Sequence, residues 1–77
     1  MKLSKAIGKR VEFLLREHNM TQYRLSKKGG IPRSTISVII DGKYDTVKLD
    51  TVYQITATLG ISLKEFFDDK IFDDIED

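Results

Sequence analysis

Two adjacent glycines between short amphipathic segments most constrain how this chain folds. The stretch 21–42 reads TQYRLSKKGGIPRSTISVIIDG. The Thr21 hydroxyl is suited to accept from the free N–H groups at the start of a helix. Gly29 and Gly30 end that helix, since glycine adopts a positive φ without steric cost, and Pro32 suits the first turn of a second helix. The predicted helices, joined at a steep angle, cover residues 22–28 and 33–40.

The second predicted helix has one apolar side and one side of small polar residues. Ile36, Ile39 and Ile40 recur at helical spacing and are expected to face inward. The remaining surface is low in bulk and rich in hydrogen-bonding groups, which fits the major groove of DNA. This face comprises Arg33, Ser34, Ser37 and Val38.

Helical periodicity predicts three more helices, which makes the fold class all-α with five helices. They cover residues 4–17, 49–59 and 63–67. Ser4 is the candidate cap of the first, Gly60 ends the second, and Ser62 with Glu65 forms a capping box for the third. The apolar stripe of 4–17 is Leu3, Ile7, Val11, Leu14 and Leu15, and that of 49–59 is Leu49, Val52, Tyr53, Ile55, Thr56 and Leu59.

The net charge of +1 hides a strong asymmetry along the 77 residues. Residues 1–64 carry 12 basic and 5 acidic side chains, a balance of +7, whereas residues 65–77 carry 1 basic and 7 acidic ones, a balance of −6. The basic body fits a polyanion partner. A charged surface that only faces water would give the same charge balance. The expectation of DNA binding therefore rests on the helix pair and not on the charge.

With these features the chain resembles the lambda-repressor-like (Cro/XRE-type) family of small helix-turn-helix DNA-binding domains. The match runs from about Ala6 to Phe67. It rests on Val11, Leu14, Thr21, Gln22, Leu25, Gly30, the run 34–37, Gly42, Lys43, Leu49, Val52, Ile55 and the run 59–62. The resemblance implies a compact domain over residues 1–67, with its motif at about 22–41, followed by an acidic C-terminal tail over 68–77.

The resemblance also implies two groups of DNA contacts. Arg33 is expected to grip a guanine edge, Ser34 and Ser37 to form hydrogen bonds, and Val38 to pack on a thymine methyl. For Tyr23, contact with the DNA backbone and simple coverage of the domain both stay open. The residues expected at the sugar-phosphate backbone are Gln22, Tyr23, Thr35, Lys43, Tyr44 and Lys48.

The chain departs from the family pattern at several buried positions. Leu15 and Ile40 stand where the family often has an arginine and a glutamate paired inside the protein. Joint replacement of such a pair by apolar residues is often neutral or stabilising, so we expect these two side chains to touch. Ser26 replaces an alanine, and its hydroxyl is expected to bond a backbone carbonyl one turn earlier. Asp41 places a negative charge near the expected phosphate path.

The tail combines strong acidity with apolar side chains. Three interpretations compete: packing on the first or fifth helix, a dimer contact, and a frayed end. The acidic charge should keep the tail away from phosphates. The residues in question are Phe67, Ile71, Phe72 and Ile75.

Catalytic and metal-binding arrangements are missing from the pattern. There is no cysteine, and His18 is the only histidine. The aspartate pairs 68–69 and 73–74 lack the glycine-containing loop of an EF-hand. We therefore expect no enzyme activity, metal, cofactor or small-molecule substrate. Charged residues interrupt the N-terminal apolar run, so we expect neither a signal peptide nor a membrane span, and a cytoplasmic protein.

Together these features predict a sequence-specific regulator of double-stranded DNA. It would bind a palindromic operator as a homodimer and act most often as a repressor. The alternative is an antitoxin or anti-regulator, in which the C-terminal segment binds a partner protein and the helix pair is secondary.

Overall fold

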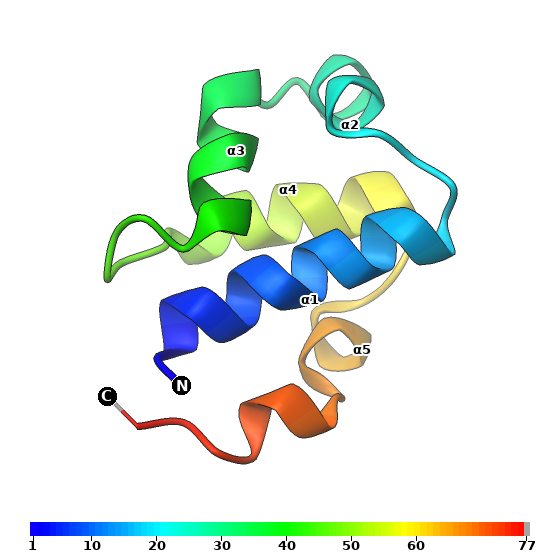
Figure 1. The fold of residues 1–77 in the computed structure, drawn as a ribbon. Coiled ribbons are helices and arrows are strands. Elements are labelled where there is room, and N and C mark those ends of the chain that lie inside the picture. The colour runs from blue at the N-terminus through cyan, green and yellow to red at the C-terminus, as the bar shows by residue number, and fades with distance from the viewer. Residues whose placement is uncertain (77) are drawn as a thin grey trace.

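The computed structural model describes residues 1–76 and contains five α-helices and one short 3₁₀ helix over that range. The all-α prediction is confirmed. α1 lies across the middle of the molecule, with α3 on one side and α5 and the C-terminal segment on the other (Figure 1). The elements are α1 (Leu3–Glu17), α2 (Gln22–Gly29), α3 (Arg33–Asp41), α4 (Leu49–Leu59), α5 (Leu63–Phe67) and η1 (Lys70–Phe72).

Local capping signals explain most helix ends. The Thr21 hydroxyl accepts from the Arg24 N–H at 3.1 Å, and the Ser62 hydroxyl accepts from the Glu65 N–H at 3.0 Å. Both predicted caps are confirmed. The bounds of α4 and α5 are as predicted, while α2 and α3 each extend one residue further. The sequence thus places these four helices correctly from neighbouring residues alone.

The start of α1 differs from the prediction. The helix begins at Leu3 after Lys2, which makes no side-chain cap bond. Ser4 as the N-cap was wrong, because it already lies inside the helix and is buried there. Leu3 was also misplaced, since 39% of it is exposed, and the buried stripe begins further along the helix.

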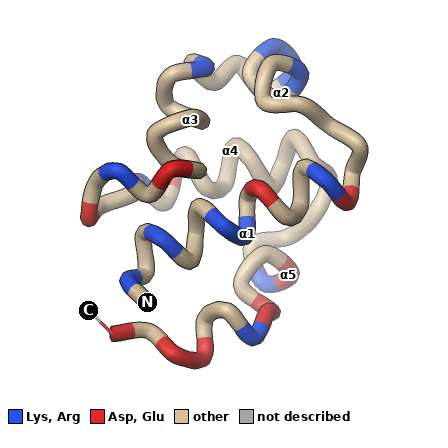
Figure 2. Tube along the Cα trace, in the orientation of Figure 1, with Lys and Arg blue, Asp and Glu red and all other residues tan. Residues whose placement is uncertain are grey.

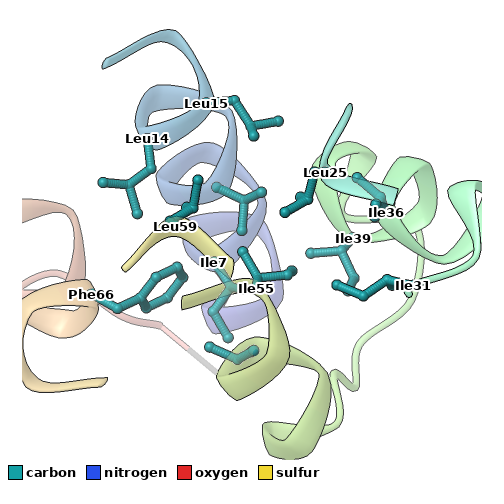
Figure 3. Packing of buried hydrophobic residues seen from close by; sticks show 12 residues of the cluster. Ile7, Leu14, Leu15, Leu25, Ile31, Ile36, Ile39, Ile55, Leu59 and Phe66 are labelled. Atoms are coloured by element: carbon teal, nitrogen blue, oxygen red, sulfur yellow. The ribbon is translucent and has the colours of Figure 1, made fainter. Parts of the chain in front are cut away.

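The core lies between α1, the α2–α3 pair and α4, with α5 closing one side (Figure 3). Ile36 and Ile39 face inward as predicted. On α4, however, Leu49 and Tyr53 are about 60% exposed, because the buried side of the helix is narrower than the predicted stripe. The largest fully buried apolar side chains are Val11, Leu25, Ile36, Val52, Ile55 and Phe66.

The backbones of α1 and α3 approach closely at Gly8. A Cβ atom at this position would clash with the carbonyl oxygen of Ile39 and lie 2.7 Å from that of Ile40. The missing side chain therefore lets α3 rest directly on α1. Leu15 belongs to the buried core cluster and Ile40 packs against that cluster. The expected touch between these two side chains stays a prediction.

Arg10 on α1 joins α5 and the tail to the core. Its side chain is 92% buried and donates to the carbonyl oxygens of Phe66 at 2.7 Å and Glu65 at 2.9 Å. A third bond, at 3.3 Å, reaches the carboxylate of Asp69. The carbonyl groups at a helix C-terminus lack intrahelical partners. The Arg10 guanidinium bonds two of those at the end of α5, and the Glu65 carbonyl oxygen also accepts from the Asp68 N–H at 3.2 Å.

Over the described residues the tail packs back on α1, and the dimer contact stays a prediction. The rings of Phe67 and Phe72 lie 5.1 Å apart, and both pack against the core. Ile71 and Ile75 are half-buried. The N-terminal ammonium contacts the Glu76 carboxylate at 2.6 Å, and this hydrogen bond, with its positive charge, lowers the pKa of the Glu76 carboxyl.

Candidate nucleic-acid interface

α3 presents its hydrophilic side outside the globule. Arg33 and Ser34, at its first turn, are exposed, while Ser37 and Val38 are half-buried one turn later. The opposite side of the helix holds Ile36 in the core. The structure therefore places the four residues expected to contact DNA bases on one accessible side of α3.

A pair of hydrogen bonds fixes the turn between α2 and α3. The Ser26 hydroxyl donates to the Ile31 carbonyl oxygen at 2.6 Å, and the Ile31 N–H donates to the Ser26 carbonyl oxygen at 3.3 Å. The expected acceptor one turn earlier was wrong. Gly30 has a φ of 66°, so the chain reverses after α2 and returns the Ile31 carbonyl over residue 26. Ser26 thus helps to fix the direction in which α3 leaves the turn.

An open groove of about 560 Å³ runs beside α3 and joins it to the following loop and α4. Tyr44 and Lys48, predicted to hold the DNA backbone, line this groove together with the base-reading candidates Ser34 and Val38. Two groups that lie apart in the sequence therefore share one surface. The groove is lined by Ile31, Pro32, Ser34, Thr35, Val38, Ile39, Tyr44, Thr46, Val47, Lys48, Thr51 and Gln54.

The loop after α3 carries exposed cations. Lys43 and Lys48 are exposed, and the Lys43 ammonium lies 5.7 Å from the centre of the Tyr44 ring. Asp45 in the same loop accepts from the Lys2 ammonium at 3.1 Å. Sequence reasoning missed this pair, because 43 positions separate its members and no local pattern links them. The Lys2 ammonium partly neutralises the Asp45 carboxylate, which would otherwise repel an anionic partner.

The start of α2 completes the surface. Gln22 is half-buried at the first position of the helix, and the Tyr23 ring is 53% exposed. The ring lies within cation–π range of Lys27 and Arg33, at 5.6 and 5.8 Å. Gln22 is thus placed at a helix N-terminus, where backbone N–H groups and the helix dipole favour a phosphate.

The charge asymmetry of the sequence is also an asymmetry in space. Figure 2 shows Lys and Arg along α1 and α2 and at the start of α3, whereas Asp and Glu gather on the C-terminal segment at the opposite end. Asp41, the last residue of α3, is exposed and remains a negative charge beside the basic surface. An anionic ligand is therefore attracted to the α2–α3 side and repelled from the tail.

Residues 1–76 hold no group of three or more His, Cys, Asp or Glu side chains arranged to bind a metal ion. His18, the single histidine, is exposed directly after α1. Within the same described part of the chain, every helix is too short or too polar to cross a membrane.

Comparison with known proteins agrees with this geometry. A family model described as a helix-turn-helix domain matches residues 8–70. An uncharacterized HTH-type transcriptional regulator of Methanocaldococcus jannaschii is 39% identical over 59 residues, which are 77% of this chain and 83% of that protein. The crystal structure of the prophage Lp1 protein 11 matches with a TM-score of 0.83 and 25% identity, covering 97% of this chain and 100% of that one. The chain therefore belongs to the lambda-repressor-like, Cro/XRE-type helix-turn-helix family of DNA-binding transcriptional regulators.

Proposed function

We propose that this protein is a sequence-specific repressor that binds a palindromic operator in double-stranded DNA as a homodimer. The observation that supports this most is the exposed polar side of α3, which shares an open groove with cationic and aromatic residues of the following loop. An α-helix fits into the major groove, where each base pair presents a distinct pattern of hydrogen-bond donors and acceptors.

The two groups of contacts have different tasks in this proposal. Arg33 binds the O6 and N7 atoms of a guanine, Ser34 and Ser37 bond neighbouring base edges, and Val38 covers a thymine methyl. The second group fixes the register of the protein on the duplex without reading its sequence. It comprises Gln22, Tyr23, Thr35, Lys43, Tyr44 and Lys48.

Dimerisation follows from the size of the site and from symmetry. One α3 helix reads only a few base pairs, and a small domain gains stability from an added interface. Two copies related by a two-fold axis would place half-site centres about 10–10.5 bp apart, or a multiple of that spacing. Occupation of such a site within a promoter would exclude RNA polymerase, which gives repression.

The alternative role of the C-terminal segment as a partner-binding arm has less support. Phe67 and Phe72 pack against the core, and Arg10 holds Asp69. Apolar side chains committed to the domain's own packing are less available to a second protein.

Paired substitutions separate base reading from backbone contact. Changing Arg33 to alanine should cost about 1–3 kcal/mol of binding free energy on the best operator and relax preference at one base pair. Changing Lys43 to alanine should instead weaken all sequences alike and lower the slope of log affinity against log salt by about 1. Both are measured by titration of labelled duplexes that differ at single positions.

Two exposed cations away from α3 serve as matched controls. Arg16→Ala removes an exposed arginine from α1, and Lys64→Ala removes an exposed lysine from α5. Neither should change base preference. An equal, uniform loss for Arg33→Ala and Lys43→Ala across all duplexes would remove Arg33 from the base-reading group.

A further inference from the structure

The Tyr23 ring is shared between two cations on different helices. The Lys27 ammonium, one turn later on α2, lies 5.6 Å from the ring centre. The Arg33 guanidinium, on the first residue of α3, lies 5.8 Å from the same centre. The contact with Arg33 crosses the turn of the helix-turn-helix, so it links the two helices through a side chain that is expected to touch DNA.

An aromatic ring can hold a guanidinium without using its hydrogen-bonding groups. The planar cation is attracted to the ring face, while its five N–H donors point outward around its edge. Arg33 held in this way keeps the donors that a bidentate contact with guanine needs. A free arginine at an exposed helix start would occupy many rotamers and lose that freedom on binding.

We propose that Tyr23 is a positioning residue for Arg33, and that the ring, not the hydroxyl, sets how strongly one base pair is discriminated. This inference rests on the proposed base-reading function of Arg33. It differs from a direct Tyr23 contact with the DNA backbone, because the phenol oxygen has no part in it. Specificity at that base pair is then a property of the Tyr23–Arg33 pair.

Two variants separate the ring from the hydroxyl. Tyr23→Phe keeps the ring and removes the oxygen, while Tyr23→Leu removes the ring. Tyr53→Leu on α4 is a matched control, because Tyr53 is 58% exposed and Tyr23 is 53% exposed. We expect all three variants to be folded, since each changes an exposed side chain, and thermal unfolding followed by circular dichroism checks this.

The first measurement uses the protein without DNA. The NMR shifts of the Arg33 side-chain protons should carry a ring-current displacement in the wild type and in Tyr23→Phe. Tyr23→Leu should abolish the displacement, and Tyr53→Leu should leave it unchanged. Arg33 shifts that are the same in the wild type and in Tyr23→Leu would overturn the proposed contact, whatever the protein does with DNA.

The second measurement uses operator duplexes in which the base pair read by Arg33 is varied. Tyr23→Leu should reduce discrimination at that pair roughly two- to fivefold, the range expected for an exposed cation–π contact, whereas Tyr23→Phe and Tyr53→Leu should preserve it. In an Arg33→Ala background, Tyr23→Leu should cause no further loss of discrimination.

The possible failures are distinguishable. A loss of discrimination in Tyr23→Phe as large as that in Tyr23→Leu would assign the effect to the hydroxyl and overturn the positioning role of the ring. Unchanged discrimination in Tyr23→Leu, with normal discrimination by the wild type, would overturn this inference alone. A wild type that binds every duplex equally would overturn the proposed function and this inference with it.

Discussion

Replacing Arg10 by methionine is expected to lower the free energy of unfolding by about 3–5 kcal/mol, because a hydrogen bond from a charged donor contributes about 1.5–3 kcal/mol and two of the lost bonds end on backbone carbonyl groups. The substitution removes three hydrogen bonds at once, including the one to the Phe66 carbonyl oxygen, while the Glu65 carbonyl oxygen keeps the Asp68 N–H as a donor. Methionine fills a similar volume, so the loss reports on the bonds and not on a cavity. Urea denaturation followed by circular dichroism measures the effect.

Two controls define the source of this loss. Arg16→Met removes an arginine from the same helix, but that side chain is 70% exposed and its ion-pair partner Glu12 is 4.0 Å away, so we expect a change of about 0–1 kcal/mol. Asp69→Asn removes the carboxylate charge and keeps an oxygen for the Ile71 N–H, and Arg10 keeps its two backbone acceptors, so we expect a smaller loss than for Arg10→Met. Equal stability of the Arg10 and Arg16 variants would contradict the assigned role of Arg10.

The Gly8→Ala variant should unfold at a temperature roughly 10 °C lower than the wild type, which corresponds to a net loss of about 2 kcal/mol for a domain of this size. Helix propensity alone favours alanine by about 1 kcal/mol. The added methyl group would meet two backbone carbonyl oxygens of α3, so α1 and α3 must separate, and overpacking of this kind costs about 1–3 kcal/mol or more. Thermal unfolding by circular dichroism or calorimetry measures the shift.

Position 9 shows how the stability of glycine and alanine variants compares on α1 where there is no contact with α3. Lys9 is exposed on the same helix. Lys9→Gly should destabilise the domain by about 1 kcal/mol relative to Lys9→Ala, the opposite order to that expected at position 8. An increase in melting temperature for Gly8→Ala would contradict the close approach of the two helices. Since that approach fixes α3, we also expect weaker operator binding by the folded variant.

The sequence was sufficient where a structural decision depends on neighbouring residues. Thr21 and Ser62 cap their helices with hydroxyl groups, and Gly30 and Gly60 end theirs with positive φ values. Each of these signals acts within a few residues, so the helix bounds were predicted to within one position. The exposed side of α3 was predicted for the same reason, because helical spacing alone places Ile36 on the buried side and Ser34 on the exposed side.

The omissions concern mainly contacts between residues far apart in the sequence, whereas Ser4, Leu3, Leu49 and Tyr53 were misassigned within their own helices. Arg10 finds its partners 55 to 59 positions later, and Lys2 reaches Asp45 across 43 positions. The Ser26 hydroxyl turns to a carbonyl that only the reversed chain brings near. Gly8 was the one omission with a visible signal, because a glycine inside a helix costs stability and usually marks a close approach.

The candidate interface depends both on local sequence signals and on contacts between distant residues. The residues of α3 were predicted from periodicity, and their roles on DNA were implied by family resemblance. The groove that joins α3 to Tyr44 and Lys48 and the placement of Tyr23 against Arg33 depend on how the helices pack. The roles of individual side chains on DNA stay predictions for the measurements above.

Selection of bound sequences from a random duplex pool by the purified protein tests the central claim most directly. If the polar side of α3 reads DNA as a homodimer, the enriched sequences should share a two-fold symmetric motif with half-site centres about 10–10.5 bp apart, or a multiple. The same selection with Arg33→Ala should relax one position in each half-site. Recovery of the unselected base composition, or an enriched motif that Arg33→Ala leaves unaltered, would contradict reading by α3.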